Sequence, residues 1–270
     1  MPIVTVLSLE DPRVAPYRAL KERELAREEG GRFIAEGEHV VRRLLESAFE
    51  TESVLLASRR ADELAPLVPA SVPVYVVPDE LIHQIIGFKF HSGVIACGRR
   101  GAPKSIDDVV PRDPGAPGLT IVICPEIANA ENMGAMIRVT ATFGADALIL
   151  GERSCDPFWR QSIRVSMGTI FKLPLVRSND LTRDLRRLQR EWHVELVATV
   201  LDERAEPLSS ARRGPKLGLL FGNEAQGLDQ AMVAACDRRV TIPMQLGTDS
   251  LNVAVAAGII LYHFTRETTR

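Results

Sequence analysis

Three polar clusters interrupt apolar runs in this 270-residue sequence, and their residue types could form a ligand site. The first cluster runs from Asn132 to Arg138, the second from Gly222 to Gly227, and the third from Met244 to Asn252. Each one follows an apolar run typical of a buried strand. Ligands of open α/β sheets bind at the carboxyl ends of the strands, so these clusters are expected to meet at one edge of a sheet.

Taken one by one, the polar residues also have purely structural explanations. Asn132 and Ser250 could cap helices, Glu224 could be an exposed loop acid, and Arg138 could be a surface charge. The spacing of the second cluster is not that of a dinucleotide-binding turn, and no P-loop lysine follows it, which argues against dinucleotide and nucleoside triphosphate sites. The five histidines are scattered, so neither a metal site nor a histidine-based triad is indicated.

The first hundred residues alternate between short strand and helix patterns, which predicts a small α/β domain. A charged helix is expected over residues 11–29, ended by two glycines. Strands are expected near residues 32–37, 53–57, 72–77 and 93–97, with helices between them, including 61–67 and 79–86.

Residues 99–118 contain four prolines and three glycines and are interpreted as a linker. The predicted organisation is an N-terminal helical extension over 1–30, a small domain over 31–98, the linker, and a second domain over 119–270. In that second domain, strands are expected at 119–124, 147–150, 173–176, 194–200 and 216–221, with helices at 130–143, 161–170, 180–190 and 250–265. Successive strand–helix units predict a mainly parallel sheet with helices on both faces.

Two of these helices carry further information. In helix 130–143, Met133, Met136 and Thr140 lie on one stripe, and Arg138 points about 140° away from it. The last helix is apolar on every side of its wheel, from Leu251 to Phe264. Such a helix must be covered all round, either by a second subunit, which is favoured, or by deep burial within the chain.

Composition restricts the class of protein less than the motifs do. The net charge of −2 does not indicate nucleic acid, although arginine doublets leave RNA possible. The sequence has no uncharged apolar run long enough to span a membrane and no signal peptide, so a cytoplasmic protein is expected. The four cysteines are far apart, which favours buried thiols over disulfides or metal ligands.

Together the clusters resemble, in order, the three motifs of the SpoU/TrmH family of RNA ribose 2′-O-methyltransferases, within the SPOUT superfamily. The matching patterns are Asn132-x-Gly-Ala-x-x-Arg138, Gly222-x-Glu224-x-x-Gly-Leu, and Ile242-Pro-Met followed by Ser250-Leu251-Asn252. Residues 164–168 also look like the family's Arg-x-Ser-x-Gly segment. Residues 32–97 resemble its N-terminal substrate-binding domain, which is related to ribosomal-protein folds. The resemblance covers almost everything after residue 30.

The resemblance implies an α/β fold with a C-terminal trefoil-knotted SPOUT domain and a small N-terminal RNA-binding domain. It implies S-adenosylmethionine as the cofactor, contacted at Thr199, Gly222, Ile242 and Leu251. It also implies a homodimer through the knotted domain, with active sites completed across the interface. Neither a metal nor a membrane is implied.

The family places Arg138 at the reacting centre, with the RNA and the loops organised by Asn132, Glu224, Ser250 and Asn252. Methyl transfer needs the nucleophile held about 3–3.5 Å from the methyl carbon. For Arg138 to act as a base, its pKa would have to fall by about five units, or about 7 kcal/mol. A permanent cation that steadies phosphate and the developing alkoxide is favoured instead. Glu224 is interpreted as fixing the loops rather than as a base.

The expected substrate is structured RNA, with ribosomal RNA favoured over transfer RNA because of the separate N-terminal domain. A catalytically silent RNA-binding relative and a base-methylating enzyme are the alternatives. The sequence departs from the family pattern at Ala254, where serine is frequent, and at Glu131, whose acid next to Asn132 is expected to narrow substrate choice.

Overall fold

A computed structural model describes residues 3–20, 31–110, 118–224, 226–245 and 250–266 of the chain. The chain divides into two compact units. Unit 1 comprises residues 1–102 together with 156–171, and unit 2 comprises 103–155 together with 172–270. Within the described residues, no helix is long and apolar enough to cross a membrane.

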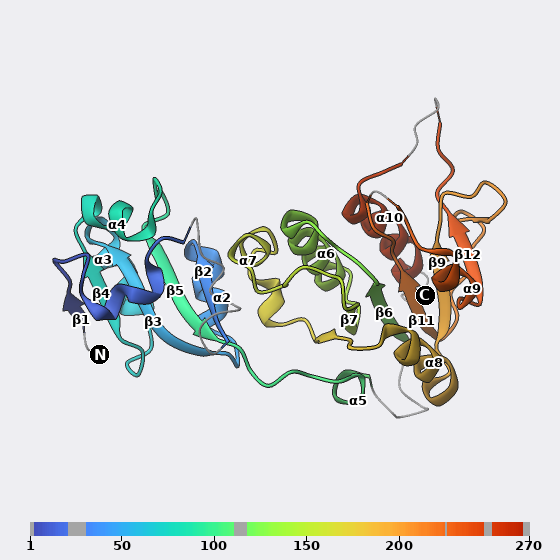
Figure 1. Cartoon of the computed structure of the whole chain (residues 1–270), viewed down its shortest axis with the longest axis horizontal. Coiled ribbons are helices and arrows are strands. Elements are labelled where there is room, and N and C mark those ends of the chain that lie inside the picture. The colour runs from blue at the N-terminus through green and yellow to red at the C-terminus, as the bar shows by residue number, and fades with distance from the viewer. Residues whose placement is uncertain (1–2, 21–30, 111–117, 225, 246–249, 267–270) are drawn as a thin grey trace. The chain divides into compact units, whose positions relative to one another are not determined.

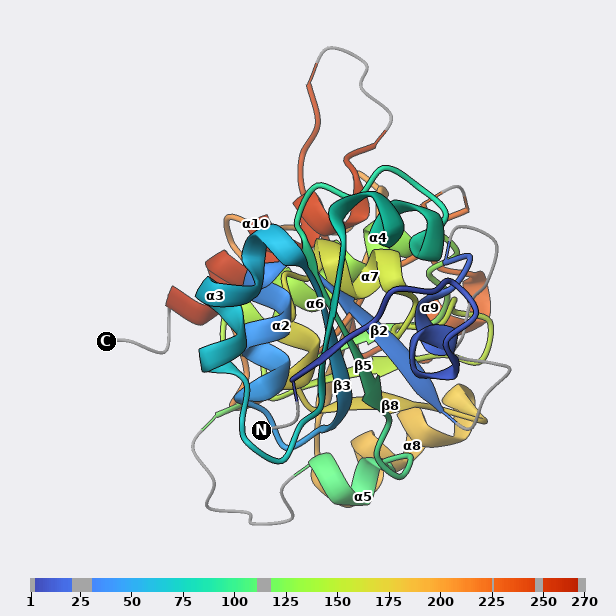
Figure 2. The same cartoon turned by 90° about the vertical axis from the view of Figure 1, so that its left-hand side faces the viewer.

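Unit 1 is built on a mixed five-stranded sheet of order β1-β4-β3-β5-β2 (Figure 1). The strands are β1 (Ile3–Thr5), β2 (Arg32–Glu36), β3 (Glu50–Ala57), β4 (Val74–Val77) and β5 (Val94–Arg99). β4 runs parallel to β1 and β3, whereas β5 runs antiparallel to β2 and β3. The helices are α2 (Glu38–Leu45), α3 (Ala61–Leu64) and α4 (Asp79–Ile86), with 3₁₀ turns η2 (Ser58–Arg60) and η3 (Ala65–Leu67); Figure 2 shows α2, α3 and α4 from a second direction.

The described part of the helix expected over residues 11–29, residues 11–20, does not form an α-helix. Residues Pro12–Tyr17 form a 3₁₀ helix, η1, and Pro16 inside it has no N–H for an α-helical hydrogen bond. Tyr17 is fully buried, and its hydroxyl contacts the Ser53 carbonyl oxygen at 3.0 Å. The segment thereby joins the core of the five-stranded sheet. Residues 21–29 of the expected helix lie outside the described residues.

Residues 156–171, from the second half of the sequence, pack within unit 1. They contain α7 (Arg160–Val165) and η4 (Thr169–Phe171). Phe158 and Phe171 lie 5.3 and 5.5 Å from Phe33, measured between ring centroids. The Arg160 guanidinium forms an ion pair with Glu36. Aromatic packing and charge pairing therefore hold this segment against β2.

Unit 2 has a seven-stranded sheet of order β10-β12-β9-β11-β6-β7-β8, and every pairing in it is parallel. The mainly parallel sheet expected from the sequence is confirmed. Its strands are β6 (Leu119–Cys124), β7 (Ala147–Leu150), β8 (Leu175–Arg177), β9 (Glu195–Thr199), β10 (Glu206–Pro207), β11 (Lys216–Leu220) and β12 (Arg238–Thr241). Strand order reverses between β6 and β11, so the crevice at their carboxyl ends is a topological switch point. The trefoil knot stays a prediction.

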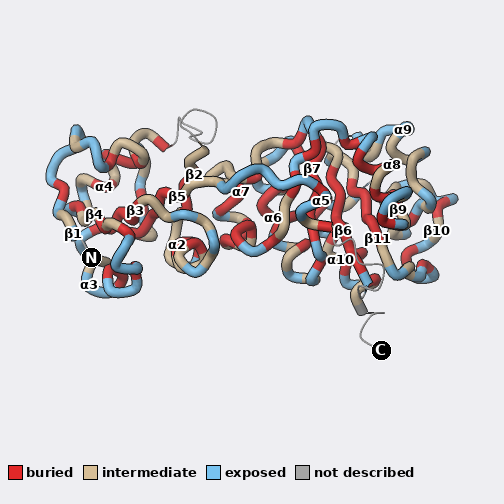
Figure 3. Tube along the Cα trace, turned by 90° about the horizontal axis from the view of Figure 1, so that it is seen from below, coloured by how far each residue is buried: buried red, intermediate tan, exposed pale blue. Residues whose placement is uncertain are grey.

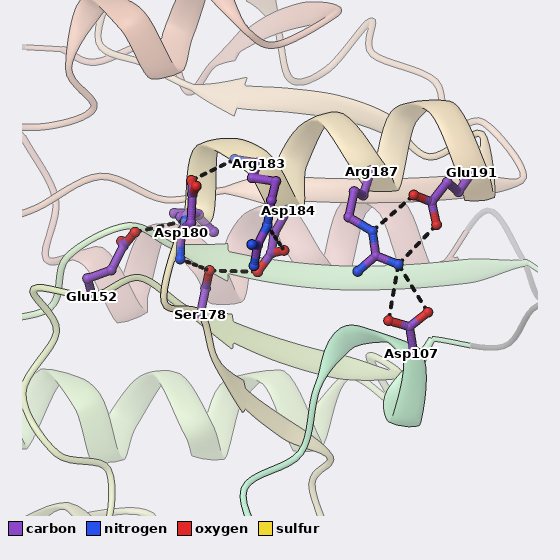
Figure 4. A network of polar contacts seen from close by, with 9 residues as sticks. Asp107, Glu152, Ser178, Asp180, Arg183, Asp184, Arg187 and Glu191 are labelled. Carbon is purple, nitrogen blue, oxygen red and sulfur yellow. Dashed lines mark hydrogen bonds and ion pairs between the residues drawn. The ribbon is translucent and has the colours of Figure 1, made fainter.

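One face of this sheet is covered by α8 (Leu181–Trp192), together with α5 (Ile106–Val109) and α9 (Gln230–Ala234). Figure 4 shows how polar contacts hold this layer. An Arg187 terminal nitrogen lies 3.1 Å from each Asp107 carboxylate oxygen, joining α8 to α5. The Ser178 hydroxyl donates to buried Asp184 at 2.7 Å. Because α5 contributes Ile106 to this core, part of the expected linker is structural.

The other layer contains α6 (Ala130–Thr142) and α10 (Val253–Arg266), which pack against each other. Phe143 and Tyr262 meet edge to face at 6.2 Å. The strands between the layers are buried, as Figure 3 shows. α10 is not buried on all sides: Val255, Ile259 and Tyr262 are 52%, 41% and 51% exposed. The alternative of a helix deeply buried within this chain is therefore wrong.

Candidate active site at the end of β6 and β11

α6 begins at the carboxyl end of β6, and Asn129 forms its N-terminal cap. The Asn129 side-chain oxygen accepts from the backbone N–H groups of Glu131 at 2.7 Å and Asn132 at 3.2 Å. A capping role for Asn132 itself is therefore wrong. Because Asn129 satisfies the exposed helix donors, the Asn132 side chain is available for long-range contacts.

Asn132 joins two of the polar clusters through its side-chain amide. Its Nδ2 donates to Glu224 Oε1 at 2.6 Å, and its Oδ1 accepts from Asn252 Nδ2 at 2.8 Å. Asn252 also caps α10, since its Oδ1 accepts from the backbone N–H of Ala254 at 3.0 Å. Residues from the ends of β6 and β11 and the start of α10 thus form one hydrogen-bonded chain.

The direction of every bond in this chain is fixed by its two ends. A carboxylate can only accept, so Glu224 requires the Asn132 amide nitrogen to face it. The α10 N–H groups can only donate, so they require the Asn252 oxygen. The remaining Asn132 oxygen and Asn252 nitrogen then match each other. Both asparagines use the donor and the acceptor of their amides, which makes the arrangement specific.

The loop that carries Glu224 closes tightly on itself. Asn223 and Gly227 exchange backbone hydrogen bonds of 3.0 and 2.8 Å. A Cβ on Gly222 would lie 2.2 Å from the Gly227 carbonyl carbon, closer than any real contact, and Gly227 has a φ of +68°. The missing side chain of Gly222 therefore makes room for the chain's own backbone. This turn sets the direction in which Glu224 projects.

The residues expected to contact the cofactor lie along three neighbouring strand ends. Thr199 ends β9, Gly222 follows β11 and Ile242 follows β12. The Thr199 hydroxyl donates to the Leu220 carbonyl oxygen at 2.8 Å, linking the ends of β9 and β11. Leu251 is half-buried just before α10. Thr199, Gly222 and Ile242 thus lie at the carboxyl ends of neighbouring strands, and their contact with the cofactor stays a prediction.

Two expected residues lie apart from the hydrogen-bonded chain. Arg138 is exposed on α6, as its angular position predicted. It comes six residues after Asn132, about 9 Å further along the helix. Ser250 is exposed, and the residues just before it lie outside the described part of the chain. Arg138 and Ser250 therefore lie outside the hydrogen-bond network of Asn132, Glu224 and Asn252.

Burial and charge act on a thiol beneath the site. Cys124 at the end of β6 is fully buried, which raises the pKa of its thiol, and the nearby charge of Glu224 raises it further. The thiol is therefore neutral at ordinary pH. Among the described residues, no group of three His, Cys, Asp or Glu side chains could hold a metal ion.

Three polar residues beside this network, Glu126, Arg153 and Asn223, are not singled out by the sequence motifs. Glu126 follows β6, and its Oε2 lies 2.7 Å from Arg153 Nε; its Oε1 accepts from Asn223 Nδ2 at 3.3 Å. The position of Glu126 could have indicated a site residue, since it is a carboxylate two residues after a wholly apolar strand. The second family motif specifies Glu224 but leaves its neighbour Asn223 as an unspecified position.

An all-parallel sheet with a polar site at its switch point defines an α/β protein that binds its ligand at the strand ends. The sequence profile of the SpoU rRNA methylase family matches residues 119–262, and that of the MRM3-like substrate binding domain matches residues 11–96. The chain belongs to the SpoU rRNA methylase family. The expected class, an RNA 2′-O-methyltransferase that uses S-adenosylmethionine, is confirmed.

Individual relatives agree with this assignment. An uncharacterized tRNA/rRNA methyltransferase of Mycobacterium tuberculosis is 35% identical over 237 residues, covering 86% of this chain and 80% of the relative. The 23S rRNA (guanosine-2′-O-)-methyltransferase RlmB of Acinetobacter baylyi is 28% identical, covering 86% and 96%. The AdoMet-bound rRNA methyltransferase of Sinorhizobium meliloti has a TM-score of 0.83 at 28% identity, and 98% of each chain is covered.

Proposed function

We propose that this protein methylates a ribose 2′-hydroxyl in ribosomal RNA, and that it works in the cytoplasm. The observation that carries the proposal is the bond chain from Glu224 through Asn132 to Asn252, which brings the family's motifs together at the switch point. Relatives from Acinetobacter baylyi and Bacillus subtilis are named as 23S rRNA (guanosine-2′-O) methyltransferases, which supports ribosomal RNA. Transfer RNA is the second candidate, because the Mycobacterium tuberculosis relative is named as a tRNA/rRNA methyltransferase.

In this proposal, different residues at the sheet edge bind the cofactor and the RNA. Thr199, Gly222, Ile242 and Leu251 border the cofactor, which supplies the methyl group. Asn132, Glu224, Ser250 and Asn252 hold the loops and the RNA in register. Arg138 lies beside the target nucleotide, where a permanent cation binds phosphate and stabilises the alkoxide as the 2′-hydroxyl loses its proton.

The enzyme is a homodimer in this proposal. Val255, Ile259 and Tyr262 lie at i, i+4 and i+7 on α10 and form one exposed apolar face. Monomeric proteins rarely leave such a face uncovered, and a two-fold interface lets one patch cover its own copy. Arg138 is exposed on α6, the helix packed against α10, so the partner can complete its surroundings.

RNA from a strain lacking the gene tests the substrate. Nuclease digestion and mass spectrometry should show one 2′-O-methyl nucleotide missing from ribosomal RNA and restored by the wild-type gene. Loss of a methyl group from transfer RNA instead would establish the second candidate. An unchanged set of 2′-O-methyl nucleotides in both RNA pools would refute methyl transfer to either.

A further inference from the structure

A small cavity opens beside the bond chain, at the ends of β6, β7 and β11. Its volume is about 150 Å³. It is lined by Pro125, Glu126, Arg153, Asn223 and the residues from Gln226 to Asp229. This volume is below the usual range for drug-sized ligands but suits one flat ring system.

We propose that this cavity receives the base of the methylated nucleotide and that Glu126 and Arg153 select guanine. The inference rests on the proposed function, because it presumes an RNA substrate. Proteins that read single bases in RNA take an unstacked base into a pocket and bind its Watson–Crick edge.

The Glu126 carboxylate lines the cavity and could accept hydrogen bonds from such an edge. Its side chain is 29% exposed. Among the described residues, Oε2 is engaged by Arg153 and Oε1 by Asn223. A carboxylate offers about four lone-pair positions, so each oxygen retains one. The N1–H and N2–H donors of guanine lie side by side and match two adjacent carboxylate oxygens.

Arg153 supplies the complementary donor. Its Nε contacts Glu126, and its side chain is 69% exposed, so its terminal nitrogens can reach an acceptor such as guanine O6. The cavity's other carboxylate, Asp229, accepts from the Met232 backbone N–H at 2.7 Å and caps α9. Uracil presents one N–H donor where guanine presents two, and adenine lacks O6, so neither base makes the full set of contacts with both side chains.

Of the expected cofactor positions, Gly222 adjoins the cavity, whereas Thr199 and Ile242 lie away from it. Asn223 points to Glu126, whereas the next residue, Glu224, points to Asn132. Thr199 and Ile242 follow β9 and β12, on the opposite side of β11 from β6 and β7. The cavity therefore lies on the β6–β7 side of Gly222, away from Thr199 and Ile242.

The test uses the full-length enzyme, S-adenosylmethionine and unmodified transcripts of the source organism's ribosomal and transfer RNA, with product nucleosides identified by mass spectrometry. We expect 2′-O-methylguanosine. Glu126→Gln should lower kcat/KM about 5- to 150-fold, the discrimination typical of one bidentate base contact. Arg204→Gln, at a site 93% exposed and outside the cavity, is the control.

A substrate with inosine at the target separates base reading from a structural role, because inosine lacks only the N2 amino group. Replacing guanosine by inosine should lower kcat/KM of the wild-type enzyme about tenfold or more. The same replacement should lower kcat/KM of Glu126→Gln only slightly, because the contact is already lost. An equal inosine penalty in both enzymes, or a product other than 2′-O-methylguanosine, would overturn the proposal.

Cofactor titration distinguishes the remaining outcomes. Glu126→Gln should bind S-adenosylmethionine as wild type does. A matching loss of cofactor affinity would assign the cavity to the cofactor's amino-acid end and overturn the proposal. If wild-type enzyme methylates no RNA, the proposed function fails and the base assignment fails with it. If wild type produces 2′-O-methylguanosine but Glu126→Gln is unimpaired, the base assignment alone fails.

Discussion

Asn252 donates a hydrogen bond from Nδ2 to Oδ1 of Asn132 over 2.8 Å, although 120 residues separate them in sequence. The bond joins the start of α10 to the start of α6. Because Asn132 also donates to Glu224, the register of three segments depends on one amide. Both asparagines have fixed orientations, so exchanging donors for acceptors at single positions should have large and asymmetric effects.

The variant Asn132→Asp tests this directly. It places a second acceptor against the Glu224 carboxylate, so we expect a loss of stability of about 1 kcal/mol or more and at least a tenfold loss of activity. The double variant Asn132→Asp/Glu224→Gln restores a donor facing an acceptor. Urea unfolding should show that it regains most of the lost stability, and strictly additive losses would contradict the assigned bond directions.

Gly222 should tolerate no side chain. In Gly222→Ala, the Cβ would meet Gly227 backbone at 2.2 Å, so the loop must open and cofactor affinity should fall. We expect a cost of about 1–3 kcal/mol. Gly227→Ala is the matched control: no atom lies within 4 Å of its Cβ, and only its φ of +68° is strained, at about 1 kcal/mol. Calorimetry with S-adenosylmethionine compares the two; equal effects would argue against the close approach.

Periodicity predicted the parallel sheet well because its strands are wholly apolar runs, such as Leu119–Cys124. It failed where tertiary contacts decide the structure. Phe158 and Phe171 pack on Phe33 in unit 1, although the residues on either side of their segment belong to unit 2. In the sequence, the only sign of this packing is that all three residues are aromatic. The three-residue strand β1 is too short for a periodic signal.

The candidate site shows the same division. Asn132, Glu224 and Asn252 were found through the family motifs, and their mutual bonds follow from strand order. Asn129 and Glu126 were missed, because capping depends on the exact first turn of a helix and the Glu126 contact depends on Arg153 from another loop.

Ile259→Glu should convert the proposed dimer into a monomer. The substitution places a charge in the centre of the α10 face, where burial against a partner would desolvate it. Sedimentation equilibrium should show the wild-type chain as a dimer and the variant at half that mass, with activity lost alongside. Leu7→Glu, a change at an exposed apolar residue of unit 1, should leave the mass unchanged. A monomeric wild-type protein would disprove the interface.

Alkaline pH should weaken the fold through its thiols. Burial, with a smaller contribution from Glu52, raises the pKa of Cys97 to about 12 from the ordinary 9.0. The unfolded chain therefore loses this proton first. Stability is unaffected below pH 9 and falls between pH 9 and 12, by up to about 1.4 kcal/mol per pH unit for one thiol. Urea titrations of wild type and Cys97→Ala should differ in this slope; parallel profiles would contradict it.

Arg138→Ala should abolish methyl transfer while leaving cofactor affinity nearly unchanged. Arg138 is exposed on α6 and lies outside the bond chain that borders the cofactor loops, so its removal should leave those loops in place. Losing the cation removes stabilisation of the developing alkoxide, for which losses of about 100-fold or more are typical. Arg138→Lys keeps the charge and should retain partial activity. Single-turnover rates give the chemical step, and calorimetry gives cofactor binding.

An equal loss of cofactor affinity would show that Arg138 supports the cofactor rather than the transferred group. A rate for Arg138→Lys as low as that for alanine would show that the guanidinium's bidentate geometry, and not its charge alone, is required.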